Sequence, residues 1–148
     1  MFDLVADLES YPAFLPLCEA LVVRQRQQLP AGTLLIIADM TVGYLAIRET
    51  FTSRVALDAA GLTVVATGAA DSRGPFRQLE NRWHFRAAAG GCDVDFFISY
   101  AFKSMLLQAL VGNLFDRVFR RYTRAFEERA HQVYGSLGQR QPGPSSSP

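Results

Sequence analysis

Residues 102–135 read FKSMLLQALVGNLFDRVFRRYTRAFEERAHQVYG, and they decide the fold because they predict one long amphipathic helix. The apolar residues recur at spacings of three and four, so they fall on one helical face. They are Leu107, Val111, Phe115, Val118, Tyr122, Phe126 and Val133. Ser104 is placed to cap the start of this helix, and Gly135 is placed to end it. At 1.5 Å per residue the helix is roughly 45 Å long, so it needs an extended apolar partner.

The chain before this helix alternates between apolar and polar residues, which is the pattern of half-buried strands. In one such run, Leu79, Trp83 and Phe85 share a face. Strands are predicted at Leu21–Gln27, Thr33–Val42, Arg48–Leu57, Leu62–Ala66, Arg77–Phe85 and Val94–Phe102. Short connections rich in glycine and proline predict antiparallel hairpins. Two short helices are predicted earlier, at Phe2–Leu8 and Tyr11–Pro16, the second with a proline in its first turn.

These elements predict an α+β fold in two layers. An antiparallel sheet with one apolar face can curl around one long amphipathic helix, which is the helix-grip arrangement. A strongly curved sheet does not touch a straight helix along its whole length, so an apolar cavity is expected between them. One domain is predicted over residues 1–135. Residues 136–148 are rich in Gly, Gln, Ser and Pro, and we expect them to be a disordered tail.

Charge and hydropathy restrict the partners and the location. The net charge is +1, with acidic residues near the start and arginines in the last helix, so the surface is polarised and no DNA partner is expected. No apolar run reaches membrane-spanning length, and the N-terminus does not resemble a signal peptide. We expect a cytoplasmic protein, able at most to contact the inner membrane peripherally. Cys18 and Cys92 lack CxxC spacing and are expected to stay reduced.

The sequence contains few residues with the spacing that catalysis or metal binding requires. It has no GxSxG motif, no glycine-rich phosphate loop and no carboxylate pair spaced for acid and base roles. His84 and His131 have no second ligand beside them at metal-binding spacing. We therefore expect a protein that is not an enzyme, with no catalytic residue, no metal and no cofactor.

The predicted cavity supplies the candidate ligand-binding residues. Glu49 shares the parity of Phe51 and Val55, so it could hydrogen-bond a ligand head group near the cavity mouth. A carboxylate that simply reaches water from a strand end is the favoured alternative. Trp83 and Tyr100 are core residues, cavity-wall residues or both. The predicted cavity wall comprises Glu49, Phe51, Val55, Trp83, Phe96, Ile98, Tyr100, Leu107, Val111 and Phe115.

Several segments, in order, resemble a known family. They are MFDLVADLE at 1–9, YPAFLP at 11–16, RETFTSRV at 48–55, GPFRQLENRWHF at 74–85, FKSMLL at 102–107, AFEERA at 125–130 and Tyr134-Gly135. Together they resemble the coenzyme Q-binding START-like proteins of the polyketide cyclase and lipid-transport superfamily. The resemblance implies a helix-grip domain that binds a ubiquinone-type lipid. Members usually have a first strand before the first helix, whereas this chain begins in that helix, and the polar stretch 67–73 is longer than the family pattern.

Two functions remain open from the sequence. The first is a carrier or chaperone for an isoprenoid quinone or another lipid, which would support respiration. The second follows from bacterial relatives described as ribosome association toxins of the RatA type, which implies binding to the large ribosomal subunit and a block of subunit association. Its candidate contacts to rRNA, or alternatively to anionic lipid, are Arg117, Arg120, Arg121 and Arg124. Glu127 and Glu128 follow closely and are placed to pair with Arg124. A cyclase or hydrolase acting on a polyketide ranks last.

Overall fold

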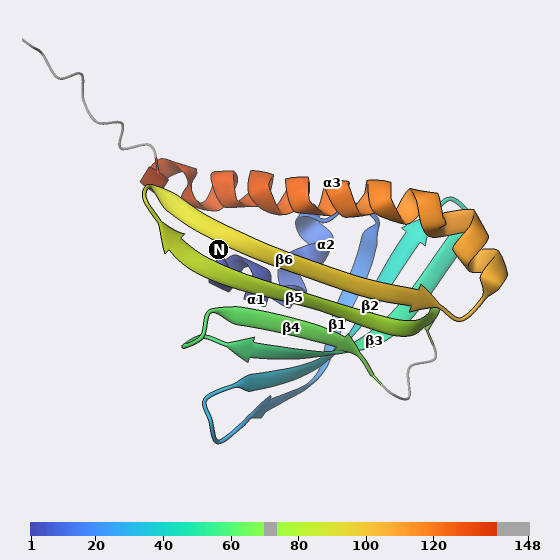
Figure 1. The fold of residues 1–148 in the computed structure, drawn as a ribbon, viewed down its shortest axis with the longest axis horizontal. Coiled ribbons are helices and arrows are strands. Elements are labelled where there is room, and N and C mark those ends of the chain that lie inside the picture. Colours follow the sequence, from blue (N-terminus) through green and yellow to red (C-terminus); the bar gives the residue numbers. More distant parts are fainter. Residues whose placement is uncertain (70–73, 139–148) are drawn as a thin grey trace, which may run out of the picture.

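Six strands form a single antiparallel sheet, and one long helix lies across it (Figure 1). The structure is a computed structural model that describes residues 1–69 and 74–138. Its helices are α1 (Phe2–Ala6), α2 (Tyr11–Phe14) and α3 (Met105–Gly138), and a 3-10 turn, η1, spans Leu8–Ser10. Its strands are β1 (Cys18–Gln28), β2 (Leu34–Tyr44), β3 (Ile47–Asp58), β4 (Thr63–Gly68), β5 (Phe76–Ala88) and β6 (Gly91–Phe102).

The strands pair in chain order from β1 to β6, each antiparallel to the next. Short connections explain this order, since tight hairpins join only antiparallel neighbours. β1 and β6 are the edge strands of the sheet. Register irregularities interrupt β1 twice and β5 once, as bulges that bend a strand do. The predicted α+β fold, with a curved antiparallel sheet and a C-terminal helix, is confirmed, and each predicted strand corresponds to an observed one.

Helix α3 runs along β6 and covers one side of the sheet (Figure 1). Its predicted start is confirmed, because the backbone N–H of Leu107 donates to Ser104 Oγ at 3.2 Å. The prediction that Gly135 ends the helix is wrong, since α3 continues to Gly138. A helical glycine costs only about 1 kcal/mol relative to alanine, which the surrounding helix tolerates. Residues 136–138 of the predicted tail are thus helical, and the rest of it lies outside the described residues.

The N-terminal region also differs from its prediction in one respect. The expected helix Phe2–Leu8 ends at Ala6, because Asp7 leaves the helical region at φ −83° and ψ 71°. A 3-10 turn follows, and Ser10 Oγ donates to Asp7 Oδ2 at 2.5 Å. A short polar residue that bonds its neighbours in this way competes with helix continuation.

The core lies where α1 and α2 meet the sheet and the C-terminal half of α3. Val5 and Ile36 are almost fully buried there. The Phe126 ring of α3 packs edge-on against Tyr11 and Phe14 of α2, with ring centroids 5.4 and 5.3 Å apart. The short helices therefore close one end of the space between sheet and helix.

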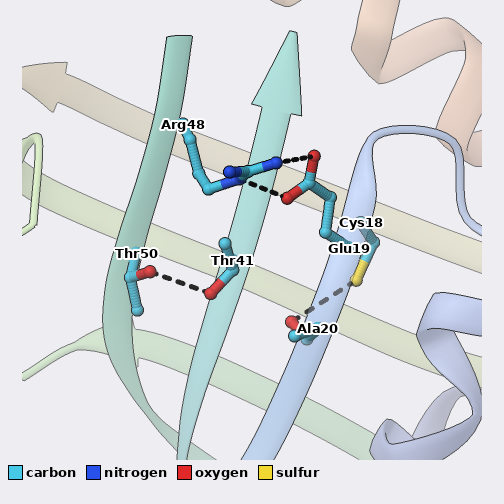
Figure 2. Close-up of polar contacts among 6 residues, drawn as sticks. All are labelled: Cys18, Glu19, Ala20, Thr41, Arg48 and Thr50. Atoms are coloured by element: carbon cyan, nitrogen blue, oxygen red, sulfur yellow. Dashed lines mark hydrogen bonds and ion pairs between the residues drawn. The ribbon is translucent and has the colours of Figure 1, made fainter.

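The outer face of the sheet is held by polar contacts between strands (Figure 2). Arg48 of β3 reaches across β2 and donates to both carboxylate oxygens of Glu19 on β1, at 2.5 and 3.1 Å. Gly43 of β2 leaves room for this crossing, because a Cβ there would overlap the Glu19 carboxylate. The hydroxyls of Thr41 and Thr50 pair beside it at 2.8 Å. These contacts join three strands on the face that points away from α3.

Candidate functional site

A cavity of about 260 Å³ lies between the concave face of the sheet and α3. Apolar and aromatic side chains from nearly every element line it. The sheet contributes Leu21, Ala38, Met40, Val42, Phe51, Val55, Val64, Ala66, Phe76, Leu79, Trp83, Phe96, Ile98 and Phe102. Helix α3 contributes Leu107, Leu114, Val118, Phe119, Tyr122 and Phe126, and the N-terminal region contributes Leu8, Tyr11, Leu15 and Leu17. Such a lining suits a mainly apolar ligand.

An aromatic cluster forms the inner wall of the cavity. Trp83 of β5 and Phe96 of β6 are paired in register, with ring centroids 4.3 Å apart. Phe126 of α3 meets the indole edge-on at 5.1 Å, and Phe119 stacks on Phe96 at 5.0 Å. Flat rings from a sheet and a helix thus face a common space, which favours a ligand with a planar ring.

The opposite end of the cavity is its mouth. Tyr44, at the end of β2, is the one exposed residue among the described lining residues, and Ile47, Leu107 and Leu114 are partly exposed, whereas Val55 and Val64 are buried. The mouth is therefore bordered by the β2–β3 hairpin and the first turns of α3.

The segment before β5 also borders this mouth. The Phe76 ring packs edge-on against Phe51 at 5.1 Å and stacks on Phe102 at the same distance. Gly74 allows this approach, because a Cβ there would lie 2.7 Å from that of Phe51. The backbone N–H of Lys103 donates to the Pro75 carbonyl at 2.8 Å and joins the segment to the start of α3.

A few polar groups interrupt the apolar lining: Glu49, Ser53, Asn81, Tyr122 and Thr123. Burial raises the pKa of Tyr122, and the nearby Cys18 thiol adds to the shift, so its hydroxyl stays neutral and able to donate. The Thr123 hydroxyl already donates to the Arg120 carbonyl at 2.9 Å. Asn81 and Ser53 add further donors to the wall. Glu49 is the only charged side chain among the described lining residues.

The Tyr11 hydroxyl has a structural role, because it donates to the Val5 carbonyl and ties α2 to α1. Its pKa is raised, first by burial and then by the charge of Asp7 and the Cys18 thiol. The ring still lines the cavity, but its polar end is already satisfied.

The structure brings most of the predicted cavity residues together. Glu49, Phe51, Val55, Trp83, Phe96, Ile98 and Leu107 all line the cavity. Tyr100 does not, and its ring packs edge-on against Phe102 at 5.6 Å. Burial first, and the Asp116 charge second, raise the pKa of Tyr100. The side chains of Val111 and Phe115 lie outside the described part of the structure.

Some lining residues were missed by sequence reasoning. The helical stripe already placed Val118, Tyr122 and Phe126 on the face of Leu107, and Asn81 shares the parity of Trp83, so these carried a signal. The lining residues of the N-terminal region carried no such signal. The apolar spacing of a short helix does not show which end of a cavity that helix closes.

The four candidate arginines of α3, Arg117, Arg120, Arg121 and Arg124, are all exposed. Within the described residues none of them forms an ion pair, so the expected pairing of Arg124 with Glu127 and Glu128 is wrong. Exposed side chains of this length remain solvated because an exposed pair gains little free energy.

The described residues contain no group of three His, Cys, Asp or Glu side chains placed to hold a metal ion. No described helix is long and apolar enough to cross a bilayer. Cys18 and Cys92 are both free thiols, the first buried and the second exposed.

Comparison with known proteins agrees with this geometry. The chain is 32% identical over 136 residues to the ribosome association toxin RatA of Rickettsia prowazekii, covering 90% of this chain and 88% of that one. It is 31% identical to the mitochondrial coenzyme Q-binding protein COQ10 homolog B of Xenopus laevis, covering 91% of this chain and 54% of that relative. Neither name is that of an enzyme.

A solved structure shows the same likeness. The solution structure of an 18 kDa protein of Caulobacter crescentus is 31% identical and superposes with a TM-score of 0.71, covering 90% of this chain and 88% of that one. Residues 1–127 match the family described as polyketide cyclase / dehydrase and lipid transport. The chain therefore belongs to the polyketide cyclase / dehydrase and lipid transport family.

Proposed function

We propose that this protein binds an isoprenoid quinone in its cavity and carries or shields it, without catalysing a reaction on it. The observation that carries the proposal is an apolar cavity with an aromatic inner wall and an open mouth. The family includes lipid transport in its description, and one relative is named as a coenzyme Q-binding protein.

The polar groups favour an orientation in which the quinone ring lies inside. Quinone carbonyls accept hydrogen bonds, and the inner wall offers donors at Asn81 and Tyr122 beside the Trp83 ring. An ionised Glu49 offers only acceptors, so it does not suit the oxidised ring and would suit the hydroxyls of a quinol instead.

The tail of the ligand would then point toward the mouth. A volume of about 260 Å³ is at the lower end of ligand cavities, which span roughly 300–1,000 Å³. It suits a head group and the first isoprene units, each buried methylene contributing about 0.8 kcal/mol. The rest of a long tail would leave through the mouth.

Trp83 allows a direct test, because it is the only tryptophan of the chain and lines the cavity. Titration with a ubiquinone analogue carrying a short alkyl tail is expected to quench its fluorescence with saturation. Phe96→Ala removes a ring from the wall and is expected to weaken binding at least about tenfold, since burial of a Phe side chain contributes roughly 1.5–3 kcal/mol.

Phe97→Ala is the matched control. Phe97 is the next residue of β6, it is exposed, and its ring lies under the Arg82 guanidinium at 4.6 Å instead of lining the cavity. Its affinity for the analogue should equal that of the wild type. Absence of saturable quenching in the wild type, with the fold verified by circular dichroism, would refute the proposal.

A second candidate function is binding to the large ribosomal subunit. It is favoured by the four exposed arginines of α3 and by the relatives named as ribosome association toxins. If it is correct, the protein should cosediment with large subunits at low salt, and Arg120→Glu with Arg124→Glu should abolish this. For each phosphate contact removed, the slope of the logarithm of the binding constant against the logarithm of the salt concentration should become shallower by about 0.7–0.9. Failure to cosediment at low salt would exclude this function.

Enzymatic activity is the least supported function, although the family description includes cyclases. Glu49 is the only charged side chain among the described lining residues, so they supply no acid and base pair. We infer that the cavity holds its ligand unchanged.

A further inference from the structure

The most exposed apolar side chains gather at the end of the molecule where the cavity opens. Leu45 and Met105 are each 91% exposed, Leu106 is 70% exposed and Leu110 is 63% exposed. Leu45 is in the tight β2–β3 connection, and the other three are in the first turns of α3. Both segments border the cavity mouth, and Figure 1 places them at the end where β6 passes into α3. We call these four residues the mouth patch.

The fold does not require these side chains. Leu45 adopts a left-handed backbone with φ 54°, which favours glycine or asparagine over leucine, and its side chain is left in water. In α3, Leu107 and Leu114 already face the cavity, while Leu106 and Leu110 point to solvent. Apart from Gln108, the first two turns of α3 thus present apolar side chains to solvent as well as to the cavity, which is typical of a helix end that meets apolar material on its outer side too.

Few charged side chains lie near the mouth patch. Glu49 lines the cavity, and Glu19 is paired with Arg48 beside the β2–β3 hairpin. No Asp or Glu occurs in the sequence between Asp39 and Glu49 or between Asp95 and Asp116. Arg77 is exposed near the start of β5, in a segment that borders the mouth. An exposed basic residue at the same end as exposed apolar side chains, as Arg77 is here, is a feature of surfaces that bind anionic bilayers.

We propose that the mouth patch docks on a lipid bilayer and inserts its four side chains at the boundary of head groups and acyl chains, so that the cavity opens into the membrane. This inference rests on the proposed function, because a quinone tail leaving the mouth needs an apolar medium to enter. A second copy of the chain fits less well, since a stable interface involves roughly 20–30 residues on each side, whereas the mouth patch consists of four residues.

Flotation with vesicles tests the docking. Wild-type protein is expected to float with vesicles of phosphatidylcholine and phosphatidylglycerol, and more weakly with phosphatidylcholine alone. The triple variant Leu45→Ser, Leu106→Gln, Leu110→Gln should lower the partition coefficient at least about tenfold, because it removes three apolar side chains from the bilayer. Arg77→Gln should lower it about fivefold on anionic vesicles and leave it unchanged on neutral ones.

The matched control changes exposed apolar residues far from the mouth. Val22→Ser and Val133→Gln alter exposed positions on β1 and near the end of α3, and should float like the wild type. Equal flotation of the triple variant and the wild type would overturn the inference, as would a wild type that does not float. If the wild type self-associates through the patch and does not float, the patch binds a second copy of the chain and not a bilayer.

Quenching of Trp83 by the short-tailed analogue, without vesicles, separates this inference from the proposed function. The triple variant should bind the analogue as the wild type does, because none of its three positions lines the cavity. Quenching without flotation would leave the carrier function intact and refute docking. Flotation without quenching would refute the carrier function and leave a membrane-docking protein.

Discussion

At the residue scale, the Asp39 carboxylate on the outer face of the sheet makes the folding stability depend on pH. Asp39 accepts hydrogen bonds from the Thr52 hydroxyl at 2.6 Å and from Arg24 at 2.7 Å. The Thr52 contact first, and the Arg24 contact second, hold the pKa of Asp39 below its usual value. A carboxylate with a lowered folded-state pKa contributes stability above its unfolded pKa of about 3.9, and that stability is lost as the pH falls through the folded value.

Thr52→Val should therefore reduce the acid sensitivity of folding. The pKa of Asp39 should rise toward its usual value, and neutral-pH stability should fall by no more than about 1 kcal/mol because the Arg24 partner is exposed. Urea unfolding at several pH values, with an NMR titration of Asp39, measures both. Thr50→Val is the control, since that hydroxyl pairs with Thr41 and contacts no carboxylate among the described residues (Figure 2). Identical acid profiles for Thr52→Val and wild type would contradict the assignment.

The two thiols should differ in reactivity. Burial raises the pKa of Cys18 to about 11, so at pH 8 only about one thiol in a thousand is the reactive thiolate. Cys92 is exposed. Iodoacetamide at pH 8 should add a single label, at Cys92, and a second label only in denaturant, as read by mass spectrometry. Labelling of Cys18 at a comparable rate in the folded protein would show that the core around it opens readily.

At the scale of elements, periodicity predicted the sheet and α3 well because their residues face one apolar side over many repeats. Trp83 and Phe96 belong to alternating strands, and their parity alone placed them on the inner face. Element ends were harder to predict. Gly135 did not stop α3, and Asp7 broke the first helix, because both outcomes depend on local hydrogen bonds and packing that apolar spacing does not encode.

The N-terminal helices were predicted, but their role at the inner end of the cavity was not. It depends on tertiary contacts that spacing does not encode: the hydrogen bond of the Tyr11 hydroxyl to the Val5 carbonyl, and above all the contact of the Tyr11 ring with Phe126, which is far along the chain. Tyr100, which was predicted to line the cavity, lies outside the described lining for a related reason. Strand parity gives the face of a residue, whereas its position relative to α3 decides whether it meets the cavity.

Tyr11→Phe tests how much this closure contributes. The variant keeps the ring but leaves the Val5 carbonyl without its donor, so the free energy of unfolding should fall by about 1–3 kcal/mol. Urea denaturation gives the value. Tyr134→Phe is the control, because the described residues give its hydroxyl no hydrogen bond, and it should change stability by less than about 0.5 kcal/mol. Equal stability of both variants would mean that the Tyr11 bond does not hold α1 to α2.

At the scale of the whole molecule, the curved sheet and α3 leave a space that the side chains do not fill. A ligand that binds only the folded protein should stabilise it by about 2.7 kcal/mol at a free concentration one hundred times its dissociation constant. Urea unfolding with and without the short-tailed quinone analogue measures this shift. Phe96→Ala should need a correspondingly higher concentration for the same shift, and stabilisation of Phe96→Ala equal to the wild type would place the ligand elsewhere.

The most direct measurement of the central claim is native mass spectrometry of protein purified from quinone-producing cells, followed by solvent extraction and identification of any lipid. The account predicts a species heavier than the bare chain by the mass of one isoprenoid quinone, present in the wild type and in Phe97→Ala and depleted in Phe96→Ala. Wild-type protein that carries no lipid, from cells with ample quinone, would contradict it.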